Sequence, residues 1–282
     1  MPGGEALSGT LYLVATPIGN LEDITFRAVR VLKEADLIAC EDTRQTRKLM
    51  NHYGISAPTL SYHEHNEAER SRELTAKLLA GTSVALVSDA GMPLISDPGY
   101  RLVRAAIDNG IRVEAVPGPS AVLTALAASG LGTDSFHFGG FLPAKPGQRL
   151  RALGALKNET ATLIFYEAPH RIVETLEAVE EVLGDRPVVV ARELTKLHEE
   201  LLRGTAAQVR AGLAARESVK GEIVLLIGKD TGAVADDTPI AAAVEACVVQ
   251  GMSRMEAIKS VAHRRGLSKR EVYGEVERSK GR

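Results

Sequence analysis

The chain has 282 residues, 45% hydrophobic and 25% charged, which is the composition of a folded globular protein with room for two or three domains. Intrinsically disordered and fibrous proteins are thereby excluded. The net charge is −2, so no global basic excess indicates a nucleic-acid partner. The distribution is uneven, however, because residues 240–282 hold nine Lys or Arg against five Asp or Glu, a local charge of +4.

Cysteine usage and the lack of long apolar runs bear on the cellular compartment. Cys40 and Cys247 are the only cysteines, and neither has a second thiol or a His nearby at the spacing of a metal site. No apolar run approaches the roughly 18 residues of a membrane-spanning helix. The N-terminal sequence MPGGEALSGT lacks the basic and apolar regions of a signal peptide. We therefore expect a cytoplasmic protein without a membrane association, a disulfide framework or a metal site.

The first half of the chain alternates predicted strands and helices. Residues 10–16 form an apolar, β-rich run that stops at Pro17, and Thr25 is placed to cap a following helix. Together with a short strand at 36–40 they predict a β-loop-α-β unit. The same pattern predicts strands at 83–88 and 112–116, and helices at 66–80, 98–109 and 119–129, of which the helix at 98–109 has a proline in its first turn.

The second half repeats this organisation and then changes character. Strands are predicted at 160–166, 187–191 and 222–227, with a helix at 169–183, and residues 229–239 have the polar composition of a linker. Helices are predicted at 240–250, 253–265 and 268–277. The resulting fold class is α/β, with α/β domains at residues 1–121 and 122–229, a linker at 230–239 and a small basic helical domain at 240–282.

Four Gly- and Pro-rich breaks directly follow predicted strands. They begin at Thr16, Ser88, Val116 and Tyr166. Ligands of open α/β sheets bind outside the carboxyl ends of strands, so four such loops together favour one binding cleft, although each loop alone is better explained as a tight βα turn. Neither a G-x-G-x-x-G after the first strand nor a G-x-x-x-x-G-K-[ST] occurs, which disfavours ordinary dinucleotide sites and P-loop NTPases.

Several charged groups stand at predicted strand ends. Residues 41–48 include two acids followed by Arg44, Arg47 and Lys48, a run that suits a helix N-terminus or a substrate-facing rim. His63 and His65 fit on one face of a strand, but no third ligand supports a metal. Acidic and basic side chains also occur together at 167–171 and 192–196. The basic tail at 240–282 can contact several phosphates or form a solvated surface.

Longer motifs carry a resemblance to a known family. In order they are LVATPIGNLEDIT, CEDTRQTRKL, LSYHEHNE, LVSDAGMPLISDPG, VPGPSA, FYEAPHR and ARELTKLHEE. This series resembles the tetrapyrrole methylase superfamily over about residues 9–228, and within it the branch that methylates small-subunit ribosomal RNA. The first loop, TPIGN, has that branch's form and differs from the G-x-G-P-G loop of porphyrin and precorrin enzymes.

The resemblance implies a fold, a cofactor and a reaction. Two α/β domains would hold S-adenosylmethionine in the cleft between them, and a small helical C-terminal domain would follow. The acceptor would be the ribose 2′-hydroxyl of a cytidine in the decoding region of 16S ribosomal RNA. The substrate would be either the small ribosomal subunit or the free RNA. A homodimer is also implied, without DNA as a partner. The motifs place the donor site at Pro17, Asp89, Ala90, Gly91, Met92, Ser120, Ala121, Tyr166 and Leu194.

Chemistry adds hypotheses for the acceptor side. A general base within reach of the hydroxyl would assist transfer, and Glu167 and Asp42 are the candidates at strand ends. Cations and polar groups would hold the RNA. We assign this role to Arg44, Arg47, Lys48, His63, His65, Arg171, Lys196, Arg264, Arg265, Lys269 and Arg270.

Three other functions stay open at this point. A precorrin-type C-methyltransferase would share the donor site and take a flat anionic acceptor, but would have no evident use for the basic tail. A non-catalytic RNA-binding assembly factor would fail to bind S-adenosylmethionine. A hydrolase of phosphorylated metabolites would use His63, Asp42 and a metal, and would be sensitive to chelators.

Overall fold

The computed structural model describes residues 8–229, 238–249, 252–265 and 267–280, and the chain divides into two compact units between Gly228 and Lys229. The first unit contains two five-stranded sheets and the second contains three helices. Within the described residues, no helix combines the length and the apolar character that crossing a membrane requires.

The first sheet is parallel throughout, in the order β3-β2-β4-β1-β5. Its strands are β1 (Thr10–Val14), β2 (Leu37–Cys40), β3 (Thr59–Ser61), β4 (Val84–Val87) and β5 (Arg112–Val116). β1 lies between β4 and β5, so the chain winds outward from β1 in both directions. This order brings the carboxyl ends of β1, β4 and β5 together at one edge of the sheet.

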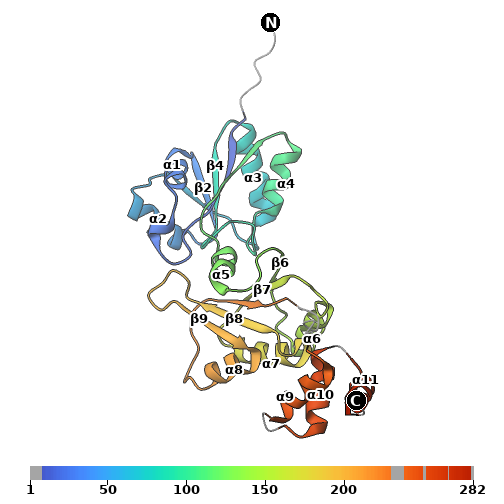
Figure 1. The fold of residues 1–282 in the computed structure, drawn as a ribbon. Helices are drawn as coiled ribbons and strands as arrows, with labels where there is room; N and C mark the ends of the chain where they lie inside the picture. Colours follow the sequence, from blue (N-terminus) through green and yellow to red (C-terminus); the bar gives the residue numbers. More distant parts are fainter. Residues whose placement is uncertain (1–7, 230–237, 250–251, 266, 281–282) are drawn as a thin grey trace. The chain divides into compact units, whose positions relative to one another are not determined.

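Helices cover both faces of this sheet (Figure 1). They are α1 (Phe26–Glu34), α2 (Thr43–Tyr53), α3 (Glu67–Leu79) and α4 (Tyr100–Asp108), with a 3-10 turn at Leu21–Asp23. Alternate residues of β1 point to opposite faces: Val14 packs with α1 and α2, whereas Leu11 and Leu13 pack with α3 and α4. The Thr25 side chain accepts the Ala28 N–H and begins α1, as predicted.

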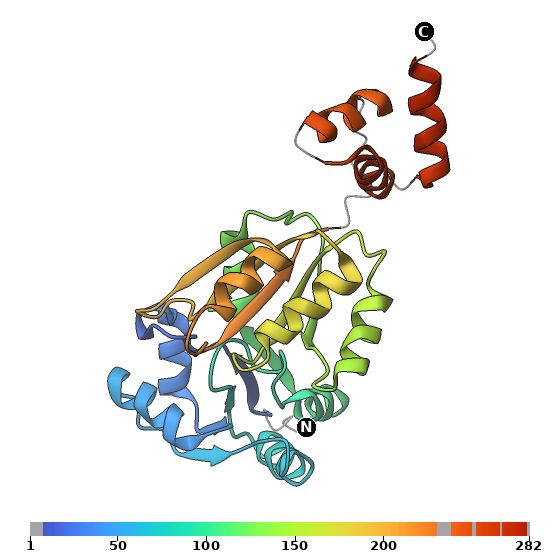
Figure 2. The same ribbon diagram turned by 90° about the horizontal axis from the view of Figure 1, so that it is seen from below.

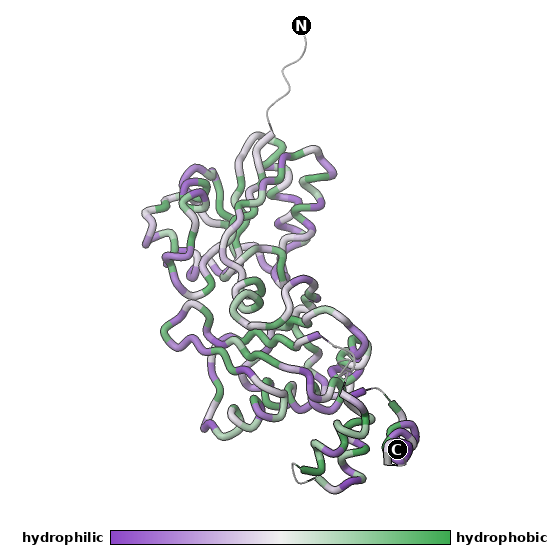
Figure 3. The backbone as a smooth tube through the Cα atoms, viewed as in Figure 1, coloured by the Kyte–Doolittle hydropathy of each residue, from purple (hydrophilic) through white to green (hydrophobic). Residues whose placement is uncertain are grey.

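The second sheet is mixed, in the order β6-β7-β10-β8-β9, with only β6 and β7 parallel. Its strands are β6 (Phe136–Phe141), β7 (Thr162–Glu167), β8 (Pro187–Arg192), β9 (Glu200–Thr205) and β10 (Ile223–Ile227). The apolar strands of this sheet are β7, β8 and β10 (Figure 3). All five residues of β10 are buried because both faces of this central strand are covered.

Helices again cover both faces of the second sheet. α6 (Pro146–Ala155), α7 (Ile172–Leu183) and α8 (Ala206–Ala214) lie side by side on the outer face (Figure 2). α5 (Ala121–Ser129) packs on the inner face, where Ala125 and Leu126 meet Val189, Val224 and Ile18. Since Ile18 belongs to the loop after β1, this cluster joins the two sheets.

The second compact unit consists of α9 (Ile240–Val249), α10 (Arg254–Arg264) and α11 (Lys269–Lys280). These helices share an apolar core that includes Val244, Ile258 and Val272. Ser268 accepts the Glu271 N–H and caps α11, one residue before the helix begins at Lys269. Residues 230–237 of the predicted linker lie outside the described residues.

The predicted fold class is confirmed, with differences in detail. Pro98 precedes α4 and Gly99, at φ +140°, is its N-cap, so the proline predicted inside the first turn lies outside the helix. The predicted boundary after residue 121 falls at the first residue of α5. The structure also contains β3, β6, α6, β9 and α8, which the sequence did not predict.

Candidate active site

The loops after β1 and β4 are tied together at the edge of the first sheet. Thr16 and Gly91 exchange two backbone hydrogen bonds of 2.9 and 3.0 Å, and the Thr16 hydroxyl donates to the Ser88 carbonyl at 3.1 Å. Gly91 adopts φ +82°, a conformation that L-residues rarely take. This ladder fixes both loops where they meet the second sheet.

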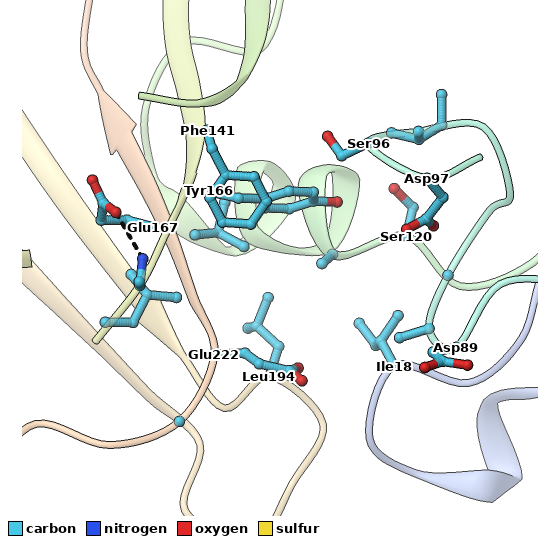
Figure 4. Close-up of a pocket in the computed structure, with 18 of the residues that line it drawn as sticks. Ile18, Asp89, Ser96, Asp97, Ser120, Phe141, Tyr166, Glu167, Leu194 and Glu222 are labelled. Atoms are coloured by element: carbon cyan, nitrogen blue, oxygen red, sulfur yellow. Dashed lines mark hydrogen bonds between the residues drawn. The ribbon is translucent and has the colours of Figure 1, made fainter. Parts of the chain in front are cut away.

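A cavity of about 370 Å³ lies between these loops and the second sheet, a size that suits a small-molecule ligand (Figure 4). One wall comes from the first sheet's loops and α5, and the other from β7, β10 and the loops around them. The lining residues are Ile18, Asp89, Ala90, Gly91, Met92, Ile95, Ser96, Asp97, Ser120, Ala121, Phe141, Tyr166, Glu167, Ala168, Pro169, Leu194, Gly221, Glu222, Ile223 and Val224.

Two aromatic rings enter this cavity from the second sheet. A bulge at Gly139 and Gly140 shifts the register of β6 against β7, and Phe141 follows it. The ring of Phe141 lies 5.6 Å from that of Tyr166. Figure 4 shows the Tyr166 hydroxyl directed across the cavity toward the side that carries Asp97 and Ser120.

Eight of the nine residues predicted for the donor site line this one cavity. They are Asp89, Ala90, Gly91, Met92, Ser120, Ala121, Tyr166 and Leu194. Pro17, the ninth, lines a neighbouring cavity of about 340 Å³ that shares Ile18, Asp89, Ala90 and Glu222 with the first.

Other lining residues were missed in the sequence. Ile95, Ser96 and Asp97 lie within the quoted LVSDAGMPLISDPG motif, so this signal was available. No sequence signal pointed to Phe141 or Glu222. A β-bulge places Phe141 at the cavity, and the antiparallel pairing of β10 with its neighbours places Glu222 there.

An ion-paired network of Lys196, Glu193 and Glu222 lies at the two cavities, with Glu222 on the lining of both. Lys196 contacts Glu193 at 2.8 Å and Glu222 at 3.1 Å, and the Glu193 carboxylate also accepts the Glu222 N–H. These contacts lower the pKa of Glu193, the Lys196 hydrogen bond most of all. The adjoining backbone is strained, with positive φ at Glu193 and at the β-branched Thr195. Lys196, predicted to hold RNA, therefore has two acidic partners.

Both carboxylates that were predicted as general bases, Glu167 and Asp42, are bonded to other groups of the protein. Glu167 is 2% exposed, and its carboxylate accepts hydrogen bonds of 2.7 Å from both the Thr175 hydroxyl and the Ala168 N–H. Arg171 lies 3.2 Å from it and also donates to the Leu142 carbonyl. In Figure 4 this carboxylate lies beyond Tyr166, away from Asp97. Such a fully bonded carboxylate does not favour the hypothesis that Glu167 is the base, and Arg171 is held inside rather than presented to RNA.

Asp42 lies outside both cavities and caps α2. Its side chain accepts the Arg44 N–H at 2.8 Å and forms an ion pair of 2.8 Å with the Arg44 guanidinium. The hydrogen bonds from Arg44 lower the pKa of Asp42 to about 2. A carboxylate with so low a pKa is a weak proton acceptor near neutral pH, and the charge of Arg44 is largely compensated.

The other predicted RNA contacts fall on two surfaces. Arg47 and Lys48 are exposed on α2, beside Arg44. His63 and His65 lie in a turn rather than on a strand, because Asn66 accepts the His63 N–H and donates to Ser61, ending β3; their rings are 5.9 Å apart.

In the second unit, Lys269 and Arg270 are exposed, Arg265 donates to the Thr238 carbonyl, and the side chain of Arg264 lies outside the described part of the structure. Across the described residues, no group of three or more His, Cys, Asp or Glu is arranged to hold a metal ion.

Comparison with known proteins identifies relatives along nearly the whole chain. The model of the tetrapyrrole (corrin/porphyrin) methylases matches residues 10–210. A protein of Halalkalibacterium halodurans named ribosomal RNA small subunit methyltransferase I is 52% identical over 272 residues, 94% of this chain and 93% of that protein. The Bacillus subtilis protein of the same name is 46% identical over 277 residues, 96% and 94% of the two chains.

Solved structures share the fold at lower identity. A uroporphyrin-III C-methyltransferase of Thermus thermophilus in complex with S-adenosylhomocysteine superposes with a TM-score of 0.55 at 22% identity, covering 77% of this chain and 97% of that one. The sequence motifs, the residues that line the cavity and the sequence identity over most of the chain all indicate the same family. The chain belongs to the tetrapyrrole (corrin/porphyrin) methylase family, and within it to the ribosomal RNA small subunit methyltransferase I proteins.

Proposed function

We propose that this protein transfers a methyl group from S-adenosylmethionine to a ribose 2′-hydroxyl of a cytidine in the decoding region of 16S ribosomal RNA. The observation that carries the proposal is the convergence of eight motif residues from both sheets on one cavity. The name shared by relatives at 46–52% identity supports the RNA acceptor over a tetrapyrrole.

The cavity residues fit the proposed donor. S-adenosylmethionine would supply an electrophilic methyl group on a positively charged sulfur. Carboxylates of Asp89 and Glu222 on the lining suit a cationic ligand, and the apolar side chains of Ile18 and Leu194 suit an adenine ring. The backbone at Ala90 and Gly91 has no bulky side chain, so a ligand can approach it closely.

The chain's own contribution to the reaction would be orientation and the exclusion of water. The Thr16–Gly91 ladder and the Lys196 network hold opposite walls of the cavity in place before a ligand enters. Fixed walls lower the entropy cost of aligning an acceptor hydroxyl for in-line displacement. Tyr166 and Phe141 shield the interior from solvent on the side of the second sheet.

Labelled-methyl transfer tests this function. Purified protein is incubated with radiolabelled S-adenosylmethionine and either small ribosomal subunits or naked 16S RNA, and the modified nucleoside is mapped. We expect label on one cytidine ribose, and the better substrate identifies whether assembled subunit or free RNA is recognised. Donor binding without transfer to either RNA would refute the proposed acceptor, and uroporphyrinogen and precorrin substrates would then be tested. If the protein does not bind S-adenosylmethionine at all, the result would favour the non-catalytic RNA-binding assembly factor.

A second prediction concerns the exposed face of α2. Among the described residues, Arg47 has no acidic partner, whereas Arg44 is paired with Asp42. Replacing Arg47 and Lys48 together by Ala should weaken binding of 16S RNA fragments several-fold at low salt and reduce the salt dependence of the affinity, because two phosphate contacts are lost. Arg44→Ala should weaken binding less. Fluorescence anisotropy across a salt series measures both effects. Equal affinity of the double variant and the parent would place the RNA elsewhere.

The remaining partner assignments belong to the same proposal. We infer a cytoplasmic homodimer that acts on the small ribosomal subunit, with Lys269 and Arg270 of α11 available for RNA phosphates. Size-exclusion chromatography with light scattering checks the dimer, and removal of residues 240–282 checks the contribution of the tail to RNA affinity.

A further inference from the structure

We propose that Asp97 is the general base that takes the proton from the acceptor hydroxyl. This inference rests on the proposed function, because it requires a hydroxyl acceptor. Asp97 lies in the loop between β4 and α4 and lines the cavity opposite Tyr166 (Figure 4).

Elimination among the cavity carboxylates leads to this residue. Glu167 is bonded to Thr175 and Ala168, Glu222 to Lys196, and Asp89 accepts the Asp42 N–H at 3.1 Å. Within the described structure, neither a cation nor a backbone N–H bonds to the Asp97 carboxylate, and the neighbouring Ser88 hydroxyl also donates to the Ala90 and Gly91 carbonyls. An oxygen of the Asp97 carboxylate is therefore available to a substrate.

The backbone around Asp97 holds the carboxylate in a defined place. Leu94 and Ser96 adopt positive φ angles of 73° and 65°, which cost free energy for residues other than glycine. Gly99, at φ +140°, packs so closely on Leu86 and Leu94 that a Cβ there would come within 2.9 Å of the Leu86 side chain. Backbone strain of this kind gathers at functional sites, where neighbouring packing holds one conformation.

The charges that face Asp97 are acidic. Its pKa is raised to about 6, mainly by burial, then by the charge of Glu41 at the end of β2 and less by that of Asp89 after β4, against the lowering effect of Ser88. Tyr166 faces it from β7 as an uncharged phenol, because burial raises the tyrosine pKa above its usual value. A carboxylate with a pKa near 6 is ionised at neutral pH and is a stronger proton acceptor than an ordinary aspartate.

The proposed step balances without another reagent. The acceptor oxygen forms a bond to the methyl carbon, the carbon–sulfur bond breaks with its electron pair staying on sulfur, and the hydroxyl proton passes to an Asp97 carboxylate oxygen. Asp97 then releases this proton to solvent, since its pKa lies below neutral pH.

The test compares Asp97→Asn with the parent in four measurements. We expect kcat to fall about 100-fold or more, as for the loss of a general base. The parent's kcat/KM should rise with pH through about 6 to a plateau, and this inflection should be absent in the variant. Donor affinity, measured by calorimetry with S-adenosylmethionine, should change less than threefold. In carboxyl-labelled protein, a 13C resonance titrating near pH 6 should disappear in Asp97→Asn.

Matched variants separate this role from others. Asp97→Glu should keep the inflection and recover part of the rate, and Asp108→Asn, an exposed aspartate of α4, should behave as the parent. A loss of donor affinity in Asp97→Asn with kcat retained would overturn the proposal and make Asp97 a donor-binding residue. An unchanged kcat and pH profile would also overturn it, while the proposed function would stand. A parent protein that methylates no RNA would instead refute the proposed function itself.

Discussion

Glu167→Gln should lower the free energy of unfolding by about 3 kcal/mol, the range found when one partner of a buried ion pair is removed. The Glu167 side chain is fully buried against Arg171, which is itself only 17% exposed. The amide retains the shape of the side chain and can still accept from Thr175, but it leaves the guanidinium without its counter-charge. Urea denaturation followed by circular dichroism at pH 7 measures the change.

The control is Glu180→Gln, which removes a half-exposed ion pair with Arg210. Surface pairs contribute about 1 kcal/mol or less, so this variant should unfold close to the parent. If Glu167→Gln leaves the unfolding free energy intact and yet abolishes methyl transfer, Glu167 is the base that its place at a strand end suggested, and the proposal for Asp97 fails with it.

Gly19→Ala should weaken binding of S-adenosylmethionine at least tenfold, about 1.4 kcal/mol. A Cβ at position 19 would lie 2.5 Å from Cγ of Lys196, 2.8 Å from the Thr195 hydroxyl oxygen and 2.9 Å from the Leu194 carbonyl oxygen. The lysine chain can move aside, but the carbonyl moves only with its backbone. That backbone carries Leu194, a wall of the cavity, so the substitution displaces the wall. Isothermal titration calorimetry gives the affinity.

Gly212→Ala is the matched control for this substitution. Gly212 lies within α8, and a Cβ there meets no atom within 4 Å. Alanine is the better helix former, so this variant should gain about 0.5–1 kcal/mol in stability and bind the donor as the parent does. An unaltered donor affinity in Gly19→Ala would mean that the contact between the first loop and residues 194–196 does not shape the site.

Four of the five strands of the first sheet were predictable from local composition, and only the short edge strand β3 was missed. Thr10–Val14 and Val84–Val87 are short apolar runs followed within a few residues by Pro or Gly, and Thr25 caps α1 at the expected place. β6 was missed because Gly139 and Gly140 give FHFGGF the composition of a loop. The half-buried β9, an edge strand, gains its order from pairing with β8, a long-range effect that composition does not show.

The part of the site that is built from loops directly after strands could be predicted from the sequence. Parallel winding brings the residues after β1, β4 and β5 together, so motif positions in these loops converge on one cavity. The roles of the acids were not predictable in this way. Glu167 and Asp97 are both acids in Gly- or Pro-rich motifs, and only the partners supplied by Thr175 and Arg171 distinguish the bonded carboxylate from the available one.

Separate apolar clusters support the two walls of the cavity, and the α5 cluster with Ile18 contains residues from both sheets. A ligand that touches both walls therefore adds contacts between two cores that this cluster already joins. Its binding free energy is lost when either sheet unfolds, so saturating donor should raise the melting temperature of both sheets and sharpen their unfolding into one cooperative transition.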